Sequence, residues 1–181
     1  SDIVTMFFSL EGIEGSGKTT EIDYLVEYFV LPGRQCVSTR EPGVTHIGSI
    51  SRSILLDTES NEMDPISELL LYMADRAQHL KETVRPALSA GKFVLCDRHF
   101  DATLAYQGYA RGLGIKLISQ LHQLAFADVN PDITILLDLP VKTGLARAWR
   151  QIENGQRTNR ETRFEEEALA FHNKVRAGYL A

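Results

Sequence analysis

The stretch Gly12-Ile13-Glu14-Gly15-Ser16-Gly17-Lys18-Thr19 decides the fold of this chain. It matches the pattern G-x-x-x-x-G-K-[ST], which is specific only when a strand precedes it and a helix follows. Residues 6–10 form an apolar run before it, and apolar residues recur at helical spacing between 18 and 30. The sequence therefore predicts a strand, a glycine-rich turn and a helix in this order.

A turn of this kind points successive backbone N–H groups at phosphate oxygens, and the helix N-terminus adds a partial positive charge. Lys18 can reach the β- and γ-phosphates of a nucleoside triphosphate, and the Thr19 hydroxyl can ligate Mg²⁺. The pattern alone does not identify the reaction, because several classes of protein share it. We expect the triphosphate to be bound by residues 12–20, which are Gly12, Ile13, Glu14, Gly15, Ser16, Gly17, Lys18, Thr19 and Thr20.

The composition is that of one globular domain over residues 1–181, with 44% hydrophobic and 24% charged residues. A net charge of −5 argues against general nucleic-acid binding, although placed arginines can still hold a small anion. We see no leader and no membrane segment, so we expect a cytoplasmic protein. Cys36 and Cys96 lie in strand-like runs and are expected to be buried, reduced thiols rather than metal ligands.

Apolar runs and amphipathic stretches alternate along the whole chain. We expect strands at 6–10, 35–39, 93–97 and 133–139, and helices at 18–30, 47–56, 64–89 and 163–179. Pro86 is expected to kink the long third helix or to end it early. Strands separated by helices indicate βαβ units, and hence an α/β fold with a three-layer, doubly wound parallel sheet.

The end of the third strand carries Asp97 and Arg98. Ligands of open α/β sheets bind beyond the carboxyl ends of the strands, so Asp97 could hold Mg²⁺ while Arg98 faces a phosphate. The alternative is a structural Asp–Arg pair at the entrance of a loop.

Two further groups of residues share helix faces. Thr103, Tyr106 and Gln107 are spaced i, i+3 and i+4, and Tyr72 and Arg76 are four residues apart. An aromatic ring and an arginine on one face can stack a base and hydrogen-bond its edge. Periodicity alone favours the alternatives, which are a core aromatic for Tyr72 and a surface charge for Arg76.

An arginine-bearing segment at about 150–163 is either a solvated loop or a lid. A lid would close over the triphosphate, exclude water and bring an arginine to the transferred phosphoryl group, which can be worth roughly 10³–10⁵ in rate. A GTPase is disfavoured, because Asn173-Lys174 is followed by Val175-Arg176 rather than by a guanine-binding aspartate. The arginines of this segment are Arg150, Arg157, Arg160 and Arg163.

Taken together, these segments resemble the thymidylate kinase family over nearly the whole chain. The resemblance is carried by residues 8–20, by Thr39-Arg40-Glu41-Pro42-Gly43 and by Asp97-Arg98-His99 through Ala105-Tyr106-Gln107-Gly108, and it continues at 136–140, 163–165 and 171–176. It implies the P-loop nucleotide kinase fold, a homodimer, and transfer of the γ-phosphoryl group of ATP to thymidine monophosphate (dTMP) with Mg²⁺, in dTTP synthesis.

The resemblance also implies a role for each site residue. Arg98 and Arg52 would hold the acceptor phosphate, and Glu14 would approach the sugar 3′-hydroxyl and the metal. The P-loop contains no arginine, as in the bacterial-type subclass, so the catalytic arginine would be Arg157 or Arg160, beside Lys18, Glu14 and Arg98. The base and sugar would be contacted by Tyr72 (stacking), Arg76, Thr103 and Gln107 (hydrogen bonding) and Tyr106 (crowding the ribose).

Three departures from the family stand out. Val44 replaces a usual glycine, so we expect a differently shaped loop, and Thr162 replaces a usual aspartate beside the lid. The family's closing strand and helix do not follow Ala181, and we expect that they are missing from this sequence. The alternatives are a kinase for another deoxynucleotide or deoxynucleoside, and a non-catalytic nucleotide-binding regulatory module, although Lys18 and Arg98 are of the right type for turnover.

Overall fold

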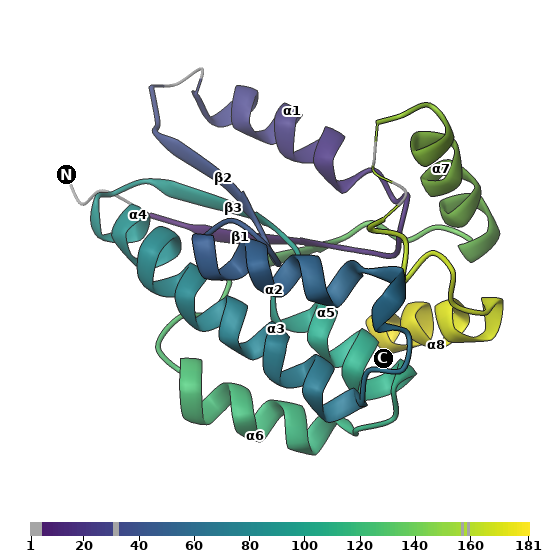
Figure 1. Cartoon of the computed structure of the whole chain (residues 1–181). Coiled ribbons are helices and arrows are strands. Elements are labelled where there is room, and N and C mark those ends of the chain that lie inside the picture. The colour runs from purple at the N-terminus through teal and green to yellow at the C-terminus, as the bar shows by residue number, and fades with distance from the viewer. Residues whose placement is uncertain (1–4, 31–32, 157, 159) are drawn as a thin grey trace.

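A computed structural model describes residues 5–30, 33–156, 158 and 160–181 of the chain. Four strands form one parallel sheet in the order β2-β3-β1-β4 (Figure 1). Adjacent β1 and β3 bring the two motif-bearing strand ends together, since Leu10 is paired with Asp97. The strands are β1 (Phe7–Glu11), β2 (Cys36–Arg40), β3 (Phe93–Asp97) and β4 (Ile133–Leu136).

Helices connect these strands, as the alternating pattern predicted. The α-helices are α1 (Lys18–Val30), α2 (His46–Leu56), α3 (Pro65–His79), α4 (Arg85–Ser89), α5 (Phe100–Thr103), α6 (Ile115–Phe126), α7 (Val141–Glu153) and α8 (Leu169–Leu180). Shorter elements are the 3-10 turn η1 (Thr58–Ser60) and the π-helical turns η2 (Leu80–Val84) and η3 (Leu104–Ala110).

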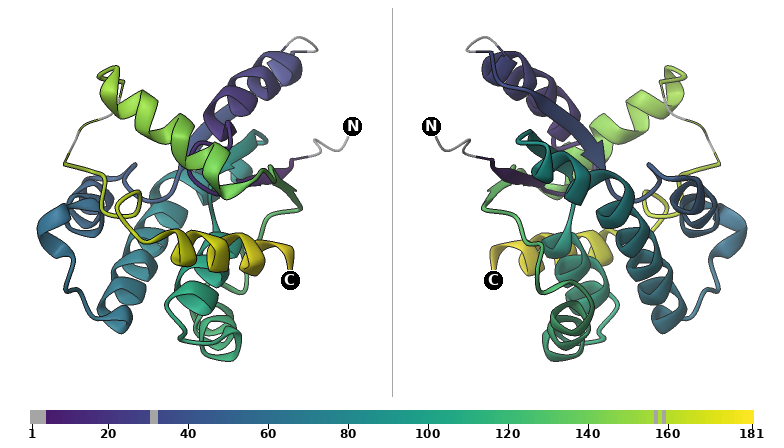
Figure 2. Two further views of the ribbon diagram at one scale, coloured as in Figure 1. Left: turned by 90° about the vertical axis from the view of Figure 1, so that its right-hand side faces the viewer. Right: turned by 90° about the vertical axis from the view of Figure 1, so that its left-hand side faces the viewer.

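The two faces of the sheet are covered by different helices, because side chains alternate along a strand. Phe8, Leu10 and Leu95 pack against Ile22 of α1 on one face. The other face, with Phe7, Val94 and Cys96, packs against Leu80, Val84, Ala87 and Phe126 from η2, α4 and α6. Figure 2 shows the helices above and below the sheet. The predicted doubly wound α/β arrangement with three layers is confirmed.

A third apolar cluster lies beyond the carboxyl ends of the strands. It joins Ile13 behind the glycine-rich turn to Tyr106 of η3, Phe164 and Val175 of α8. Helix α8 runs along η3, so the last described helix supports the part of the chain that follows Arg98.

Two helix boundaries differ from the prediction. The long helix expected at 64–89 changes to a π-helical turn before Pro86, which then occupies the first turn of α4, where a missing N–H costs nothing. The helix expected at 163–179 begins only at Leu169. The earlier residues form turns instead, and the Arg163 side chain there donates to backbone carbonyls of Leu55 and Ser60.

The cysteines are both free thiols, as expected, but only Cys96 is buried. Cys36 is half-buried because β2 is an edge strand, so the prediction of two buried thiols was wrong for that residue. None of the helices in the described ranges combines the length and apolar character needed to span a membrane.

Candidate active site

A cavity of about 860 Å³ opens at the carboxyl ends of β1 and β3. Most of the residues predicted from the sequence line it together, although they come from five separate segments. They are Glu14, Gly15, Ser16, Gly17, Lys18, Thr19, Thr20, Arg52, Tyr72, Arg76, Asp97, Arg98, Thr103, Tyr106 and Gln107. Gly12 and Ile13 do not line the cavity; both are buried behind the loop.

Close backbone contacts fix the glycine-rich loop. Gly15 has φ +69°, and a Cβ built on it would lie 2.0 Å from the carbonyl oxygen of Gly144 in α7. The reverse also holds, because a Cβ on Gly144 would lie 2.4 Å from the Glu14 carbonyl oxygen. Helix α7 therefore holds the loop from behind through two residues without side chains.

Lys18 is the first residue of α1, and its buried side chain reaches back to the loop. Its Nζ donates to the carbonyl oxygens of Gly12 (3.1 Å) and Ile13 (3.0 Å) and to the Ser16 hydroxyl (3.1 Å). Burial lowers the pKa of Lys18 to about 8. The ammonium group is thus held at the edge of the cavity, where phosphate oxygens can replace carbonyl oxygens as acceptors.

The predicted metal ligands lie side by side. The Thr19 hydroxyl donates to Asp97 Oδ2 over 3.4 Å, which follows from the pairing of β1 with β3. A hydroxyl and a carboxylate are the hard oxygen donors that Mg²⁺ prefers. These two side chains have the chemistry that a magnesium site would need.

The carboxylate of Glu14 is held by three side chains. It accepts a short hydrogen bond from the Tyr106 hydroxyl, and Arg98 Nη2 and His172 Nδ1 lie 3.3 and 3.4 Å away. Burial alone would raise the pKa of Glu14, but the hydrogen bonds and charges of these partners keep it well below its ordinary value. Tyr106 therefore fixes an ionised carboxylate, a role that the resemblance did not imply.

Arg98 occupies the junction between this carboxylate and the sheet. Its φ of +70° is strained for a residue with a Cβ, and it is the one non-glycine residue with positive φ in the described ranges. Its Nη1 donates to the Tyr179 hydroxyl (3.1 Å), which in turn donates to Glu11 Oε2 (3.1 Å). Its guanidinium also lies 5.0 Å above the Tyr106 ring. Strain at this position points to function rather than to packing.

Arg76 and Tyr72 line the cavity from α3. Arg76 is only 1% exposed, so the surface charge that periodicity favoured is wrong. It donates to Glu41 Oε2 (2.8 Å), to the Thr103 hydroxyl (2.9 Å) and to the His99 carbonyl (3.0 Å). Tyr72 is half-buried beside it and lines the cavity. The sequence pattern placed Arg76 on the surface because the partners that allow its burial come from distant segments.

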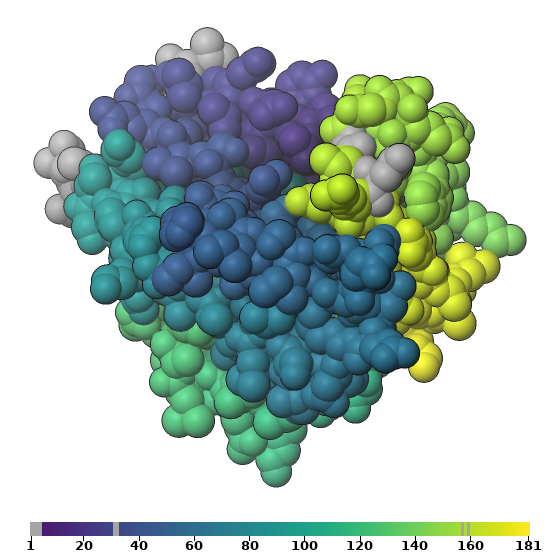
Figure 3. Space-filling view, viewed as in Figure 1, coloured from purple at the N-terminus to yellow at the C-terminus, as the bar shows by residue number. Residues whose placement is uncertain are grey.

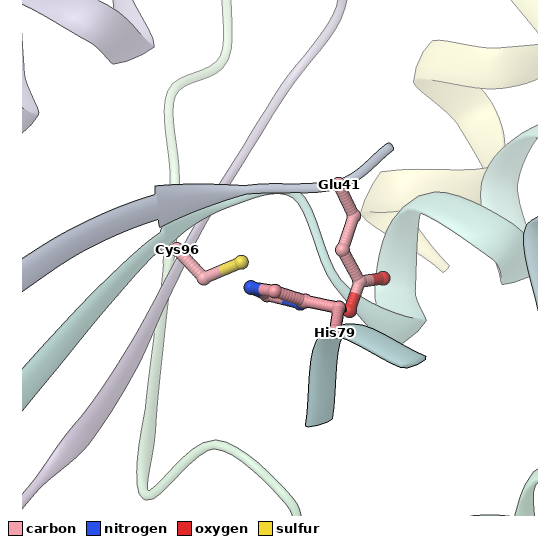
Figure 4. Close-up of side chains that lie close together, drawn as sticks. All are labelled: Glu41, His79 and Cys96. Atoms are coloured by element: carbon pink, nitrogen blue, oxygen red, sulfur yellow. The ribbon is translucent and has the colours of Figure 1, made fainter. Parts of the chain in front are cut away.

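Glu41, His79 and Cys96 place three possible ligand atoms within 4.8 Å of one another, as Figure 4 shows. The atoms are already engaged, however. His79 contacts Glu41 through Nδ1 (2.9 Å) and Thr39 through Nε2 (2.7 Å). Burial keeps the pKa of the Cys96 thiol well above its ordinary value, which disfavours a thiolate. The cluster is best explained as a support for the Glu41–Arg76 ion pair.

The segment expected to form the lid also reaches the cavity. Its Gln151, Gln156, Thr158 and Glu161 contribute to the lining. Arg52 donates to Glu161 Oε2 over 2.9 Å and to the Pro42 carbonyl over 3.1 Å, so the segment touches α2. The two segments meet on the face shown in Figure 3.

The arginines of this segment differ from one another. Arg163 is buried and its Nη2 lies 2.7 Å from Glu68 Oε2, so it anchors the segment. Arg160 is exposed and does not line the cavity, while Arg157 lies outside the described residues. Arg150 is exposed on α7.

The two departures from the family have plain structural outcomes. Val44 does not adopt positive φ, whereas the neighbouring Gly43 does, at +110°, so the valine is accommodated in this loop without backbone strain. Thr162 is buried and its hydroxyl donates to Glu166 Oε1 (2.9 Å).

Sequence reasoning missed several supporting residues, including Glu68, His172 and Tyr179. The last two lie on one face of α8, seven residues apart with Val175 between them, and that periodicity was a usable signal. Glu68 gave no such signal, because its partners Gln107, Arg111 and Arg163 are remote in sequence.

The comparisons with known proteins agree with this geometry. A sequence model described as thymidylate kinase matches residues 10–181. Proteins named thymidylate kinase from Desulforapulum autotrophicum and Syntrophotalea carbinolica are 54% and 53% identical, over 97% and 98% of this chain and 78% and 82% of their own lengths. A third, from Desulfosudis oleivorans, is 51% identical over 97% of the chain and 82% of its own length. A loop built for phosphates, a buried arginine set and this similarity lead to one conclusion: the chain belongs to the thymidylate kinase family.

Proposed function

We propose that the protein transfers the γ-phosphoryl group of ATP to dTMP, giving dTDP and ADP, as a step in dTTP synthesis. The observation that carries this proposal is one cavity lined by two chemically different groups of residues. Lys18 and Thr19 would form a phosphate-binding end, and Tyr72, Arg76 and Gln107 would form a base end suited to a flat base with a polar edge. Such a cavity suits two nucleotides placed head to head.

Each charged residue of the cavity would have a separate role in the phosphoryl transfer. Lys18 would bind the donor phosphates, and Arg98 would bind the acceptor phosphate through charge-assisted hydrogen bonds. Glu14, kept ionised by its three partners, would accept a hydrogen bond from the acceptor's 3′-hydroxyl. Thr19 and Asp97 would hold Mg²⁺, which neutralises charge on the transferred phosphoryl group when bound.

Residues 150–163 would close as a lid over the donor within a single kinase domain spanning 1–181. We propose Arg157 or Arg160 as the arginine that reaches the transferred group, since Arg163 is committed to Glu68. We further propose a cytoplasmic homodimer. Exposed apolar side chains on α2 and α3 support a dimer contact, namely Ile47, Ile50, Ile54, Ile66 and Leu70.

The test is a panel of acceptors. Purified protein is mixed with ATP, Mg²⁺ and each nucleoside monophosphate in turn, and ADP release is followed. Fast turnover with dTMP and slow turnover with the other acceptors is the expected result. Tight ATP binding without turnover on any acceptor would instead identify a nucleotide-binding regulatory module, and turnover on another deoxynucleotide would identify a different kinase.

A further inference from the structure

Glu68 lies just outside the cavity and touches a residue that lines it. It is fully buried on α3, one helical turn before Tyr72. Its Oε1 accepts from Gln107 Nε2 (2.8 Å) and from Arg111 Nε (3.2 Å), and its Oε2 lies 2.7 Å from Arg163 Nη2. Two guanidinium groups therefore flank one buried carboxylate.

This environment fixes the orientation of the Gln107 side-chain amide. A carboxylate between two guanidinium groups is ionised and only accepts hydrogen bonds. The amide must therefore turn its NH₂ group to Glu68, because the opposite orientation would set its carbonyl oxygen against a negative charge. Gln107 Oε1 is left as the amide atom available to the cavity, and no residue in the described ranges donates to it.

The neighbouring groups have a fixed polarity as well. Arg76 Nη1 is buried without a hydrogen-bond partner in the described part of the chain, so it is an unused donor. The Thr103 hydroxyl accepts from Arg76, which leaves its own proton to donate. The base end thus offers donors from Arg76 and Thr103 and a fixed acceptor from Gln107.

We propose that Glu68 is a positioning residue that determines base specificity, an inference that rests on the proposed function. A pyrimidine with a C4 carbonyl beside an N3–H matches a donor next to a fixed acceptor, and thymine has this edge. A cytosine-type base presents an N3 lone pair, which would face Gln107 Oε1 and leave buried polar groups unpaired. Glu68 enforces the selection without touching the base.

The test uses Glu68→Gln with Glu167→Gln as the matched control. Glu167 pairs with Arg111 from the other side and does not contact Gln107. In Glu68→Gln the new amide can donate or accept, so the Gln107 amide is free to reverse. The acceptors are dTMP and the deoxynucleotide of 5-methylpyrimidin-2-one, which keeps the methyl group, carries an N3 lone pair and lacks an N4 donor.

We expect the wild type and Glu167→Gln to share one ratio of kcat/KM between the two acceptors. Glu68→Gln should reduce that ratio roughly 10- to 100-fold, chiefly through KM. A purely structural role would lower both acceptors equally, and an unchanged ratio overturns the proposal. If Glu68→Gln does not fold, Gln107→Leu decides, because it removes the fixed acceptor while leaving Glu68 between its arginines. An unchanged ratio in Gln107→Leu also overturns the proposal. Absence of wild-type turnover with dTMP would refute the proposed function instead, so the two failures are distinguishable.

Discussion

Replacing Gly144 with alanine tests whether α7 positions the phosphate-binding loop. A Cβ at this position would lie 2.4 Å from the Glu14 carbonyl oxygen and 2.9 Å from Ile13 Cδ1. Relief requires a displacement of roughly 1 Å, because carbon and oxygen normally remain more than about 3 Å apart. The loop cannot slide past the helix, since Gly15 meets the Gly144 carbonyl in the same contact.

The expected change in stability of Gly144→Ala is the sum of two opposing effects. In a free helix, alanine would be more favourable than glycine by about 1 kcal/mol. Overpacking against backbone costs about 1–3 kcal/mol, so the expected net result is a modest loss of stability. A displacement of about 1 Å at a phosphate-positioning loop costs about 100-fold in rate, so kcat/KM should fall far more than stability.

The assay measures Tm, ATP affinity and kcat/KM for Gly144→Ala beside Ala146→Gly. Ala146 is exposed on the same helix, so its replacement weakens α7 by propensity alone and leaves the loop in place. We expect reduced ATP affinity and kcat/KM only in Gly144→Ala. A higher Tm with unchanged kcat/KM in that variant would refute the reasoning, because the loop would then have yielded without consequence.

Three further predictions concern the charged groups. Arg98→Ala should weaken dTMP binding roughly 10- to 100-fold with little change in ATP affinity. The control Arg176→Ala removes an exposed ion pair with Asp138 and should change neither affinity. Equal effects of the two variants would contradict the assignment of Arg98 to the acceptor phosphate. Burial raises the pKa of Glu11 from 4.5 to about 7, which corresponds to about 3 kcal/mol. Between these two pH values the folded state holds a proton that the unfolded state releases, so the free energy of unfolding should fall as the pH rises from 4.5 to 7. In urea titrations, Glu11→Gln should remove this pH dependence. Tyr106→Phe removes a donor to Glu14 and should move the acid limb of the kcat/KM profile to higher pH; an unmoved limb would show that Glu14 ionisation does not limit the reaction.

Local sequence patterns predicted those structural elements whose formation depends on residues close in sequence. The strands and the helix after the glycine-rich loop follow from spacing, and parallel pairing then brings Thr19 to Asp97. The π-helical turn before Pro86 could not be predicted, because both a kink and a stop relieve the missing N–H.

The supports of the base end could not be predicted for a different reason. Arg76 appears exposed by periodicity, yet Glu41, 35 residues away, neutralises it in the core. Burying either group alone would cost several kcal/mol, so neither position makes sense without the other. A prediction that uses only residues close in sequence places such an arginine on the surface, and for Arg76 that prediction was wrong.

These distant partners suggest how the base end is organised. Arg76 and Gln107 both line the cavity, and each is held by a buried carboxylate: Arg76 by Glu41, which itself lines the cavity, and Gln107 by Glu68, which does not. Each carboxylate can do this only because other cations or donors compensate it, with Arg111 and Arg163 serving Glu68. The direction in which the Gln107 amide faces the cavity is therefore set by Glu68, a residue outside the cavity wall. Substitutions that alter base choice should consequently be found behind the cavity as well as in its wall.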